Sequence, residues 1–307
     1  MYASWEIISF CNLACNHCYS TYHDGHLSPK KMFKRLSIGD IKIGLKNLKS
    51  AGITQINLEG GEPTIMGLEL VEAVKYSKDL GIETIVSTHG MFLFRNELIY
   101  KLIDAGIDSI SLSLDGTTES VNDSIRVNHS GAAMNQFQIV LDFLEWYKVQ
   151  CLSTIPFRLK INSVVRRDNI DNLRNIGRLV MNILPNGLPV QIKLAQVQPR
   201  GICKKVYNSI SVRNLDFLNL VNHVKRYCTF QVVSRSYDGG EYPFVVVTKD
   251  GAVTIPNGEE HTEVIIDGCP LNIFDNSFVE LFQKFIHDNP SFITKNAGIN
   301  TYTSGDN

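Results

Sequence analysis

Long apolar runs are missing from this sequence of 307 residues, and none approaches the roughly 20 residues that a membrane-spanning helix needs. The N-terminus has neither a basic leader nor a small-residue cleavage site, and it leads directly into an apolar stretch, Trp5 to Phe10. Charge of one sign is not in excess either, because 30 Lys and Arg residues face 31 Asp and Glu residues. We therefore expect a cytoplasmic protein whose main ligand is neither a membrane nor a nucleic acid.

Cysteine spacing is informative because cytoplasmic proteins rarely form disulfide bonds, which leaves the seven cysteines as thiols or metal ligands. Cys11, Cys15 and Cys18 follow the first apolar stretch in a C-x3-C-x2-C pattern, whereas the other four cysteines are scattered. Three thiolates on one short loop can hold three corners of an iron–sulfur cluster and leave one iron open for chemistry. A structural zinc site of the Cys3His type, with His17 as fourth ligand, is the alternative.

The pattern of apolar segments predicts an α/β fold. Six short stretches rich in Ile, Val and Leu have the character of buried parallel strands: 5–10, 55–59, 83–88, 109–114, 157–164 and 191–195. Helical patterns fill the gaps between them, at 38–51, 67–80, 96–105, 135–149 and 170–184. Six such units are too few for a closed eight-stranded barrel, so we expect a partial (β/α)6 TIM-like barrel, with a doubly wound sheet as the alternative.

After about residue 196 the alternation changes, which predicts a small C-terminal α+β extension. Its expected elements are a helix near 212–227, strands at 229–233, 244–248 and 252–255, and a final helix near 277–288. The predicted boundaries are residues 1–200 for the partial barrel, 201–290 for the extension and 291–307 for a polar, loosely ordered tail.

Polar motifs follow the predicted strands, and the carboxyl ends of parallel strands are where ligands gather. The second strand leads into Glu59-Gly60-Gly61-Glu62-Pro63, the third into Ser87-Thr88-His89-Gly90, and the fourth into Ser113-Leu114-Asp115-Gly116. Paired glycines let a backbone approach a ligand closely. Alternation along the fifth strand places Lys160 and Asn162 on one face.

Together, the cysteine pattern and these motifs resemble the radical S-adenosylmethionine (SAM) superfamily over about residues 5–200. The resemblance implies a [4Fe–4S] cluster on Cys11, Cys15 and Cys18, with SAM bound at the open iron through its amino and carboxylate groups. It also implies reductive cleavage of SAM to a 5′-deoxyadenosyl radical, which abstracts hydrogen from a substrate. A flavodoxin or a ferredoxin would supply the electron.

The same resemblance implies further residues for SAM binding, namely His17, Tyr19, Gly60, Gly61, Glu62, Thr88, Ser113, Arg126, Asn162 and Gln196. His17 takes the position beside the adenine, and Glu62 lies near the amino group. Other roles are open from the residues themselves: Arg126 could form a structural salt bridge, and Asn162 could be a buried amide with satisfied partners. His89 stands where the family often has Asn, which leaves its role open.

One substrate hypothesis comes from the C-terminal region. The segment Phe244–Pro256 resembles the hairpin of the SPASM or Twitch module, which implies a peptide or a small metabolite as substrate. That module has Pro-Cys where this sequence has Pro256-Asn257. An auxiliary cluster is therefore not expected, although Cys203, Cys228 and Cys269 could converge in space.

A nucleotide is the alternative substrate, because Leu159–Asn169 looks similar to the fifth-strand region of viperin-like enzymes. A nucleotide requires cationic side chains for its phosphates, and the candidates are Lys160, Arg166, Lys193 and Arg200. A non-catalytic Fe–S or zinc protein is a third reading, and the succession of intact motifs argues against it.

Overall fold

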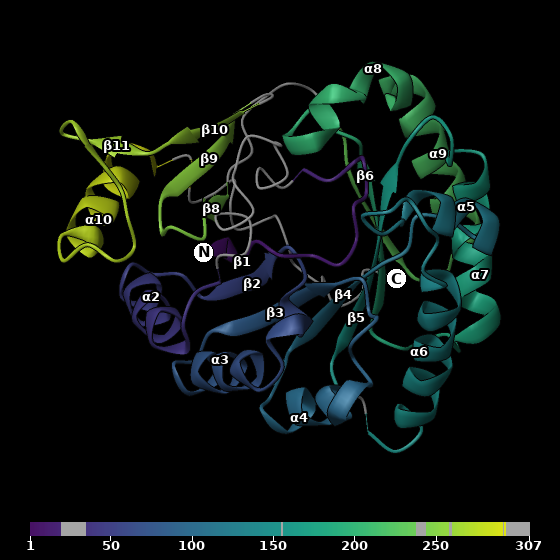
Figure 1. Cartoon of the computed structure of the whole chain (residues 1–307), viewed down its shortest axis with the longest axis horizontal. Coiled ribbons are helices and arrows are strands. Elements are labelled where there is room, and N and C mark those ends of the chain that lie inside the picture. Colours follow the sequence, from purple (N-terminus) through teal and green to yellow (C-terminus); the bar gives the residue numbers. More distant parts are fainter. Residues whose placement is uncertain (20–34, 155, 238–243, 258–259, 291, 293–307) are drawn as a thin grey trace.

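The computed structural model describes residues 1–19, 35–154, 156–237, 244–257, 260–290 and 292. Its main sheet has ten strands in the order β10-β9-β8-β1-β2-β3-β4-β5-β6-β7 (Figure 1). The strands are β1 (Tyr2–Ile8), β2 (Gln55–Gly60), β3 (Glu83–Thr88), β4 (Ser109–Ser113), β5 (Arg158–Val165), β6 (Val190–Gln196), β7 (Gln231–Arg235), β8 (Val245–Val247), β9 (Val253–Asn257) and β10 (Glu260–Glu263). A separate two-stranded sheet pairs β11 (Ile265–Ile266) with β12 (Cys269–Pro270).

Helices cover the outer side of the curved main sheet, as Figure 1 shows. The helices of the described chain are α2 (Ile38–Ser50), α3 (Leu68–Asp79), α4 (Leu98–Asp104), α5 (Glu119–Ile125), α6 (Gln136–Gln150), α7 (Ile176–Ile183), α8 (Tyr207–Ile210), α9 (Asn214–Tyr227) and α10 (Phe278–Asp288). The short α8 does not cover the outer side but lies above the end of β6. In the part of the chain that the structure describes, no helix is both long enough and apolar enough to cross a membrane.

An α/β fold with an open parallel sheet is confirmed, and the sheet has more parallel strands than the sequence predicts. Parallel pairing runs without a break from β8 through β1 to β7. β7 follows α9 as one more helix–strand unit, and β8 pairs with β1. The sequence predicts strands near both positions but assigns them to the extension, because no local pattern specifies the partner of a strand.

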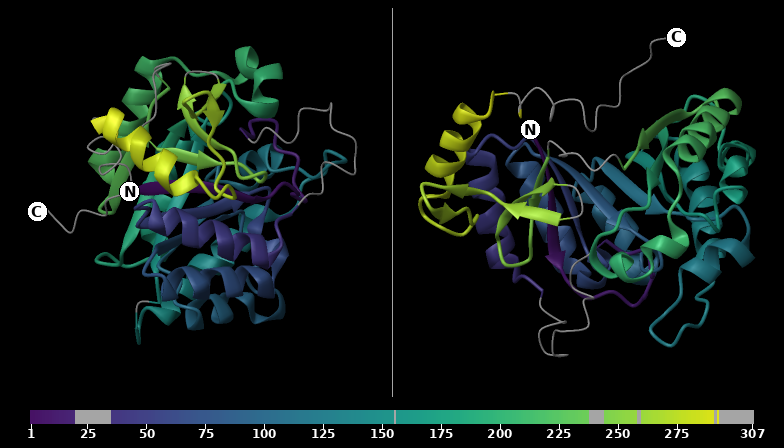
Figure 2. Two further views of the ribbon diagram at one scale, coloured as in Figure 1. Left: turned by 90° about the vertical axis from the view of Figure 1, so that its left-hand side faces the viewer. Right: turned by 90° about the horizontal axis from the view of Figure 1, so that it is seen from above.

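The predicted boundary at residue 200 stays a prediction, although β7 and β8 extend the main sheet beyond it. β9 and β10 continue the sheet on the side of β8 with antiparallel pairing. Figure 2 shows α10 with this antiparallel hairpin at one edge of the molecule and α9 at the other. The predicted tail, 291–307, lies outside the described residues except for residue 292.

The side of the sheet that faces the helices is apolar and tightly packed. Trp5 of β1 is fully buried against α2, where a Cβ added to Gly44 would lie 2.4 Å from the indole ring. Glycine at this position therefore lets α2 approach the sheet. Because side chains alternate along a strand, Ser4 and Glu6 point to the opposite side, into the interior of the curved sheet. The candidate site lies on that interior side.

Candidate active site

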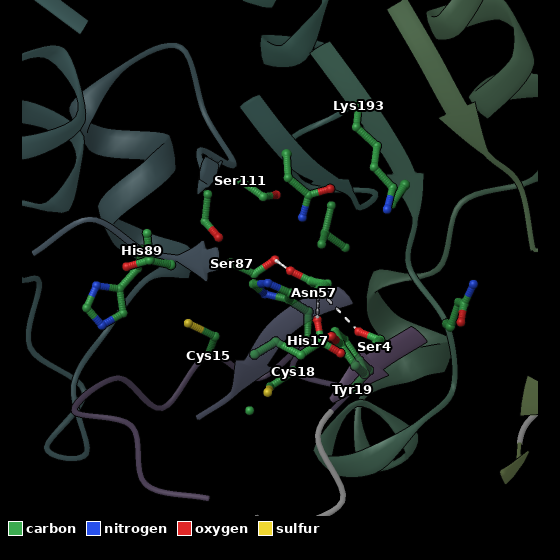
Figure 3. Close-up of a pocket in the computed structure, with 18 of the residues that line it drawn as sticks. Ser4, Cys15, His17, Cys18, Tyr19, Asn57, Ser87, His89, Ser111 and Lys193 are labelled. Atoms are coloured by element: carbon green, nitrogen blue, oxygen red, sulfur yellow. Dashed lines mark hydrogen bonds between the residues drawn. The ribbon is translucent and has the colours of Figure 1, made fainter. Parts of the chain in front are cut away.

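A cavity of about 250 Å³ lies inside the curve of the sheet, at the carboxyl ends of its central strands (Figure 3). Every residue that the sequence analysis assigned to the cluster or to SAM lines this cavity: Cys11, Cys15, His17, Cys18, Tyr19, Gly60, Gly61, Glu62, Thr88, Ser113, Arg126, Asn162 and Gln196. Their individual roles stay predictions. Their common location follows from the parallel sheet, which brings the end of each strand to one edge.

The cysteine loop follows β1 and is held in place by the segment after α5. The amide of Ala14 donates to the Val127 carbonyl at 2.7 Å. The ring of His129 lies within hydrogen-bond distance of the Cys11 carbonyl, at 2.9 Å. These contacts fix the backbone of the loop, whereas its thiols line the cavity.

The three thiols do not form a site for a single metal ion in the described part of the chain. Among the described residues, no group of three or more Cys, His, Asp or Glu side chains is close enough to hold one metal ion. A cubane cluster binds each thiolate at a separate iron, so its ligands need not converge on one point. Burial raises the pKa of Cys15, and burial together with the Glu62 carboxylate raises the pKa of Cys11. Iron binding must therefore displace the thiol protons.

Gly60 and Gly61 allow the backbone at the end of β2 to approach the backbone of Ile8 and Phe10 closely. A Cβ at Gly61 would lie 2.0 Å from the Phe10 carbonyl oxygen, and one at Gly60 would lie 2.1 Å from the Ile8 carbonyl oxygen. The amide of Gly61 donates to Ile8 at 2.6 Å, and the amide of Glu62 donates to Phe10 at 2.8 Å. The glycine pair thus places the end of β2 against the chain that enters the cysteine loop, a role that the sequence analysis did not predict.

Glu62 connects the end of β2 to the end of β3. Its side chain is almost fully buried. One carboxylate oxygen accepts hydrogen bonds from the Thr64 amide at 3.1 Å and from the Thr88 hydroxyl at 2.7 Å. The other accepts from the His89 amide at 2.9 Å. The carboxylate therefore has a structural role here, and its contact with the amino group of SAM stays a prediction.

His89 joins this carboxylate to the cysteine loop. Its Nδ1 accepts a hydrogen bond from the Met91 amide at 3.2 Å, which assigns the ring proton to Nε2. That nitrogen lies 2.8 Å from Asn12 Oδ1 and 3.1 Å from Glu62 Oε2. Burial lowers the pKa of His89, although the Glu62 carboxylate opposes this effect. The neutral imidazole thus presents its Nε2 proton to Asn12 and Glu62, and it links the cysteine loop to the motif after β2.

We expect His89→Leu to lower the free energy of unfolding of the metal-free protein by about 1–3 kcal/mol, because Asn12 and Glu62 lose a buried donor. His89→Asn should lose less, because an amide can still donate. Urea unfolding followed by circular dichroism measures both, with His287→Leu on the exposed side of α10 as control. Equal stability of His89→Leu and the unchanged protein would contradict the linking role.

A buried ion pair lies beside the cysteine loop. Asp115 is fully buried, and its carboxylate lies 2.6 Å from the Arg126 guanidinium. Its second oxygen accepts from the Val164 amide at 2.8 Å. Burial acts to raise the pKa of Asp115, but Arg126 and His17 hold the pKa below its usual value. The structural salt bridge of Arg126 is therefore present, and its contact with SAM stays a prediction.

Both ring nitrogens of His17 are occupied by protein groups. Nε2 lies 3.3 Å from Asp115, and Nδ1 lies 3.3 Å from Nη1 of Arg166. Because arginine can only donate, Nδ1 accepts and Nε2 carries the proton. Burial lowers the pKa of His17 to about 4. Because both ring nitrogens already have protein partners, neither is free to bind zinc, which argues against the Cys3His site that the sequence left open.

Two predicted SAM contacts have different surroundings. Asn162 on β5 lines the cavity, and its buried Oδ1 has no hydrogen-bond partner among the described residues. In contrast, Gln196 donates to the Val212 carbonyl at 2.8 Å and accepts from the Tyr237 amide at 2.6 Å. An unsatisfied buried acceptor fits a hydroxyl donor of a ligand, whereas the Gln196 amide already joins two segments of the chain.

The sequence analysis missed a polar layer on the interior face. The Asn57 amide donates to Ser4 at 3.2 Å and to Glu59 at 2.7 Å, and the Ser87 hydroxyl donates to Asn57 at 2.8 Å (Figure 3). Alternation along β1 and β2 was the signal that could have found Ser4 and Asn57, because both alternate with buried apolar residues.

The remaining C-terminal cysteines lie in three different surroundings. Cys203 is buried with Val197 and Ile210. Cys228 packs against the main core, and Cys269 of β12 is exposed. Pro256 and Asn257 end β9, at the position where the module that the sequence resembles has its cysteine.

Comparison with known proteins adds to this geometry. Residues 5–148 match the profile of the Radical SAM superfamily. This segment, slightly less than half of the chain, is therefore similar to the radical SAM domain. That superfamily uses a [4Fe–4S] cluster and SAM, and the three thiols, the unsatisfied Asn162 oxygen and the shared cavity fit both cofactors.

Relatives with different names share this part of the chain. An AdoMet-dependent heme synthase of Oleidesulfovibrio alaskensis is 27% identical over 180 residues, 59% of this chain and 42% of the relative. The mycofactocin maturase MftC of Mycolicibacterium smegmatis is 28% identical over 208 residues, 67% of this chain and 47% of the relative. An S-adenosylmethionine-dependent nucleotide dehydratase of Flammeovirga pacifica is 26% identical over 215 residues, 69% of this chain and 68% of the relative. The chain thus spans less than half of the first two.

Solved structures share the fold over most of the chain. SuiB of Streptococcus suis has a TM-score of 0.67 at 13% identity, covering 92% of this chain and 65% of that chain. The structure of anSMEcpe with bound AdoMet has a TM-score of 0.63 at 18% identity, covering 92% and 80%. These likenesses confirm the partial-barrel class of the fold.

Proposed function

We propose that this chain is a radical SAM enzyme that reductively cleaves SAM at a [4Fe–4S] cluster and abstracts hydrogen from a peptide or small-metabolite substrate. The observation that supports it is the single cavity, which joins the cysteine loop, the motifs after β2, β3 and β4, and a polar interior. Hydrogen abstraction requires the radical source and the substrate to share such a space. The cofactors supply the 5′-deoxyadenosyl radical when bound.

The protein's own residues would position the cluster and SAM and enclose them in the cavity. Cys11, Cys15 and Cys18 would hold the cluster, and Asn162 Oδ1 would accept from a ribose hydroxyl. The His89 and Glu62 contacts keep the cysteine loop against the end of β2. Cluster and SAM therefore meet a scaffold that is already ordered, which reduces the entropy cost of bringing the reactants together.

A nucleotide substrate is the second candidate, and Lys193 and Arg200 favour it because both line the cavity. Arg166 does not contribute in this way, because its guanidinium binds Asp168 at 2.6 Å and Asn16 at 2.6 Å. Lys160 is buried outside the cavity lining. The similarity to the nucleotide dehydratase supports this candidate, whereas the similarity to MftC supports a peptide.

A flavodoxin or ferredoxin is the electron donor that we propose, and the cytoplasmic location stays a prediction. The cleavage of SAM can be tested without a protein electron donor, because dithionite can supply the electron. We expect anaerobic reconstitution to give about four irons per chain and, after addition of dithionite and SAM, to release 5′-deoxyadenosine. Iron and sulfide analysis and chromatography of the products measure both. Bound zinc without SAM cleavage would overturn the proposal, and about eight irons would indicate a second cluster on the scattered cysteines.

A further inference from the structure

The interior of the curved sheet carries opposite charges on different strands. Lys193 of β6 and Arg235 of β7 line the cavity together with Glu59 of β2. Three strands, β3, β4 and β5, separate β2 from β6 in the sheet, so the curvature places the cationic and anionic walls on different sides of the cavity. None of these three residues was assigned to the cluster or to SAM.

Lys193 is a half-buried cation, and no side chain of the described residues neutralises it. In the described part of the chain, no hydrogen bond or ion pair at contact distance joins its ammonium to another residue, and Figure 3 shows the side chain extending from its strand into the pocket. Burial, Arg235 and Lys160 lower the pKa of Lys193 to about 7, although Glu59 opposes them. An anionic ligand would give this ammonium an ionic partner and would restore its charge.

Arg235 is fixed as a second cation on the same side of the cavity. Its guanidinium lies 4.5 Å from the ring centroid of Phe244, which also lines the cavity. Stacking on an aromatic ring orients the planar guanidinium. Lys193 and Arg235 therefore form one cationic wall, contributed by neighbouring strands.

Glu59 is held in place by hydrogen bonds on the opposite wall. Its carboxylate accepts from the Asn57 amide at 2.7 Å and also from the hydroxyls of Ser4 and Tyr19. Burial raises the pKa of Glu59, and Lys193 and Arg235 act against that rise. These cations influence Glu59 from a distance, because no ion pair within contact range joins Glu59 to either of them. A bridging ligand could fill the space between the two walls.

We propose that this cavity binds a small zwitterionic substrate whose anionic group, a carboxylate or a phosphate, pairs with Lys193 and Arg235 while its amine pairs with Glu59. This inference rests on the proposed function, because it names the class of molecule that would receive the radical. The two pairings fix both ends of the substrate, so the carbon atoms between them are held in one orientation relative to the cysteine loop. An apolar substrate would leave the Lys193 ammonium without an ionic partner among the described residues.

The test uses the anaerobically reconstituted protein with SAM and measures binding of small probes by isothermal titration calorimetry. 4-Aminobutyrate carries an amine and a carboxylate, and O-phosphoethanolamine carries an amine and a phosphate. Butyrate and ethyl phosphate lack the amine, and butylamine lacks the anion. We expect at least one zwitterion to bind roughly tenfold more tightly than its counterpart without the amine and than butylamine, because two charge-assisted contacts replace one. The tighter of the two zwitterions identifies the anionic group.

Variants separate the two walls. Lys193→Met should weaken zwitterion binding by at least roughly tenfold, and Lys193→Arg should preserve most of it. In Glu59→Gln the advantage of the amine should disappear, because the carboxylate that distinguishes the probes is gone. Lys225→Met and Glu280→Gln, at exposed positions on α9 and α10, serve as matched controls. Thermal unfolding of each variant checks that it is folded. If Lys193→Met does not fold, Lys193→Gln replaces it.

Each outcome has a defined meaning. Zwitterion binding that is unchanged in Lys193→Met, or an amine that adds nothing in the unchanged protein, would overturn the inference. Binding of phosphate probes with no contribution from the amine would instead favour a nucleotide, and would also overturn it. Release of 5′-deoxyadenosine by the unchanged protein reports the proposed function separately, so failure of one is distinguishable from failure of the other.

Discussion

Cys15→Ala is expected to abolish SAM cleavage and to leave the reconstituted protein with far fewer than four irons per chain. Cys15 is the middle cysteine of the C-x3-C-x2-C loop and lines the cavity between the ends of β1 and β4. Two thiolates cannot replace three around a cubane, and the residual ligands Cys11 and Cys18 would leave two irons without protein ligands. Iron analysis, the visible absorption of the cluster and the yield of 5′-deoxyadenosine measure the effect together.

The control for this variant is Cys228→Ala. Cys228 packs against α7 at Gly177 and does not line the cavity. We expect it to retain about four irons and the cleavage activity. If Cys15→Ala keeps a full complement of iron, the cluster is held elsewhere and the assignment of the loop is wrong. If Cys228→Ala loses iron as well, the loss in Cys15→Ala reflects damage to the fold and not the loss of a ligand.

The fold was largely predictable because its central strands are buried, rich in apolar residues and regularly spaced. Strands β2 to β6 and helices α2, α3 and α6 match the apolar segments of the sequence within a few residues. α5 was missed, since Glu119–Ile125 is short and mixes acidic and polar residues with only two apolar ones. β8 pairs with β1 across more than 230 residues of sequence, and no local pattern specifies such a partner.

The candidate site was predictable as a set of motifs but not as a set of contacts. Spacing identified the three cysteines, and the order of the strands placed the polar motifs at one edge of the sheet. The link from His89 to Asn12 was not predictable, because it joins two loops by side chains whose meeting depends on packing. The same holds for Lys193: alternation indicates its face, but only the structure reveals that no carboxylate of the described residues lies within salt-bridge distance of it.

The second large effect is expected at the buried ion pair. Asp115→Asn should lower the free energy of unfolding of the metal-free protein by about 3–5 kcal/mol, because Arg126 is left as a buried charge without its counter-ion. Urea unfolding followed by circular dichroism measures the change. The exposed pair of Arg213 and Asp216 on α9 supplies the control, and Asp216→Asn should produce no comparable loss.

A double-mutant cycle distinguishes an uncompensated charge from simple loss of packing. Arg126→Met alone leaves Asp115 buried and charged, whereas Asp115→Asn with Arg126→Met removes both charges. We therefore expect the double variant to be more stable than the sum of the single losses predicts.

The pH dependence provides an independent check on the same pair. The pKa of Asp115 is below its usual value, so the contribution of Asp115 to stability is complete above the ordinary aspartate pKa of about 4 and is lost as the pH falls toward the lower value of the folded protein. Asp115→Asn should remove this part of the acid-side loss. If the two losses simply add and the acid-side slope is unchanged, Asp115 and Arg126 contribute to stability by packing alone and not by their charges.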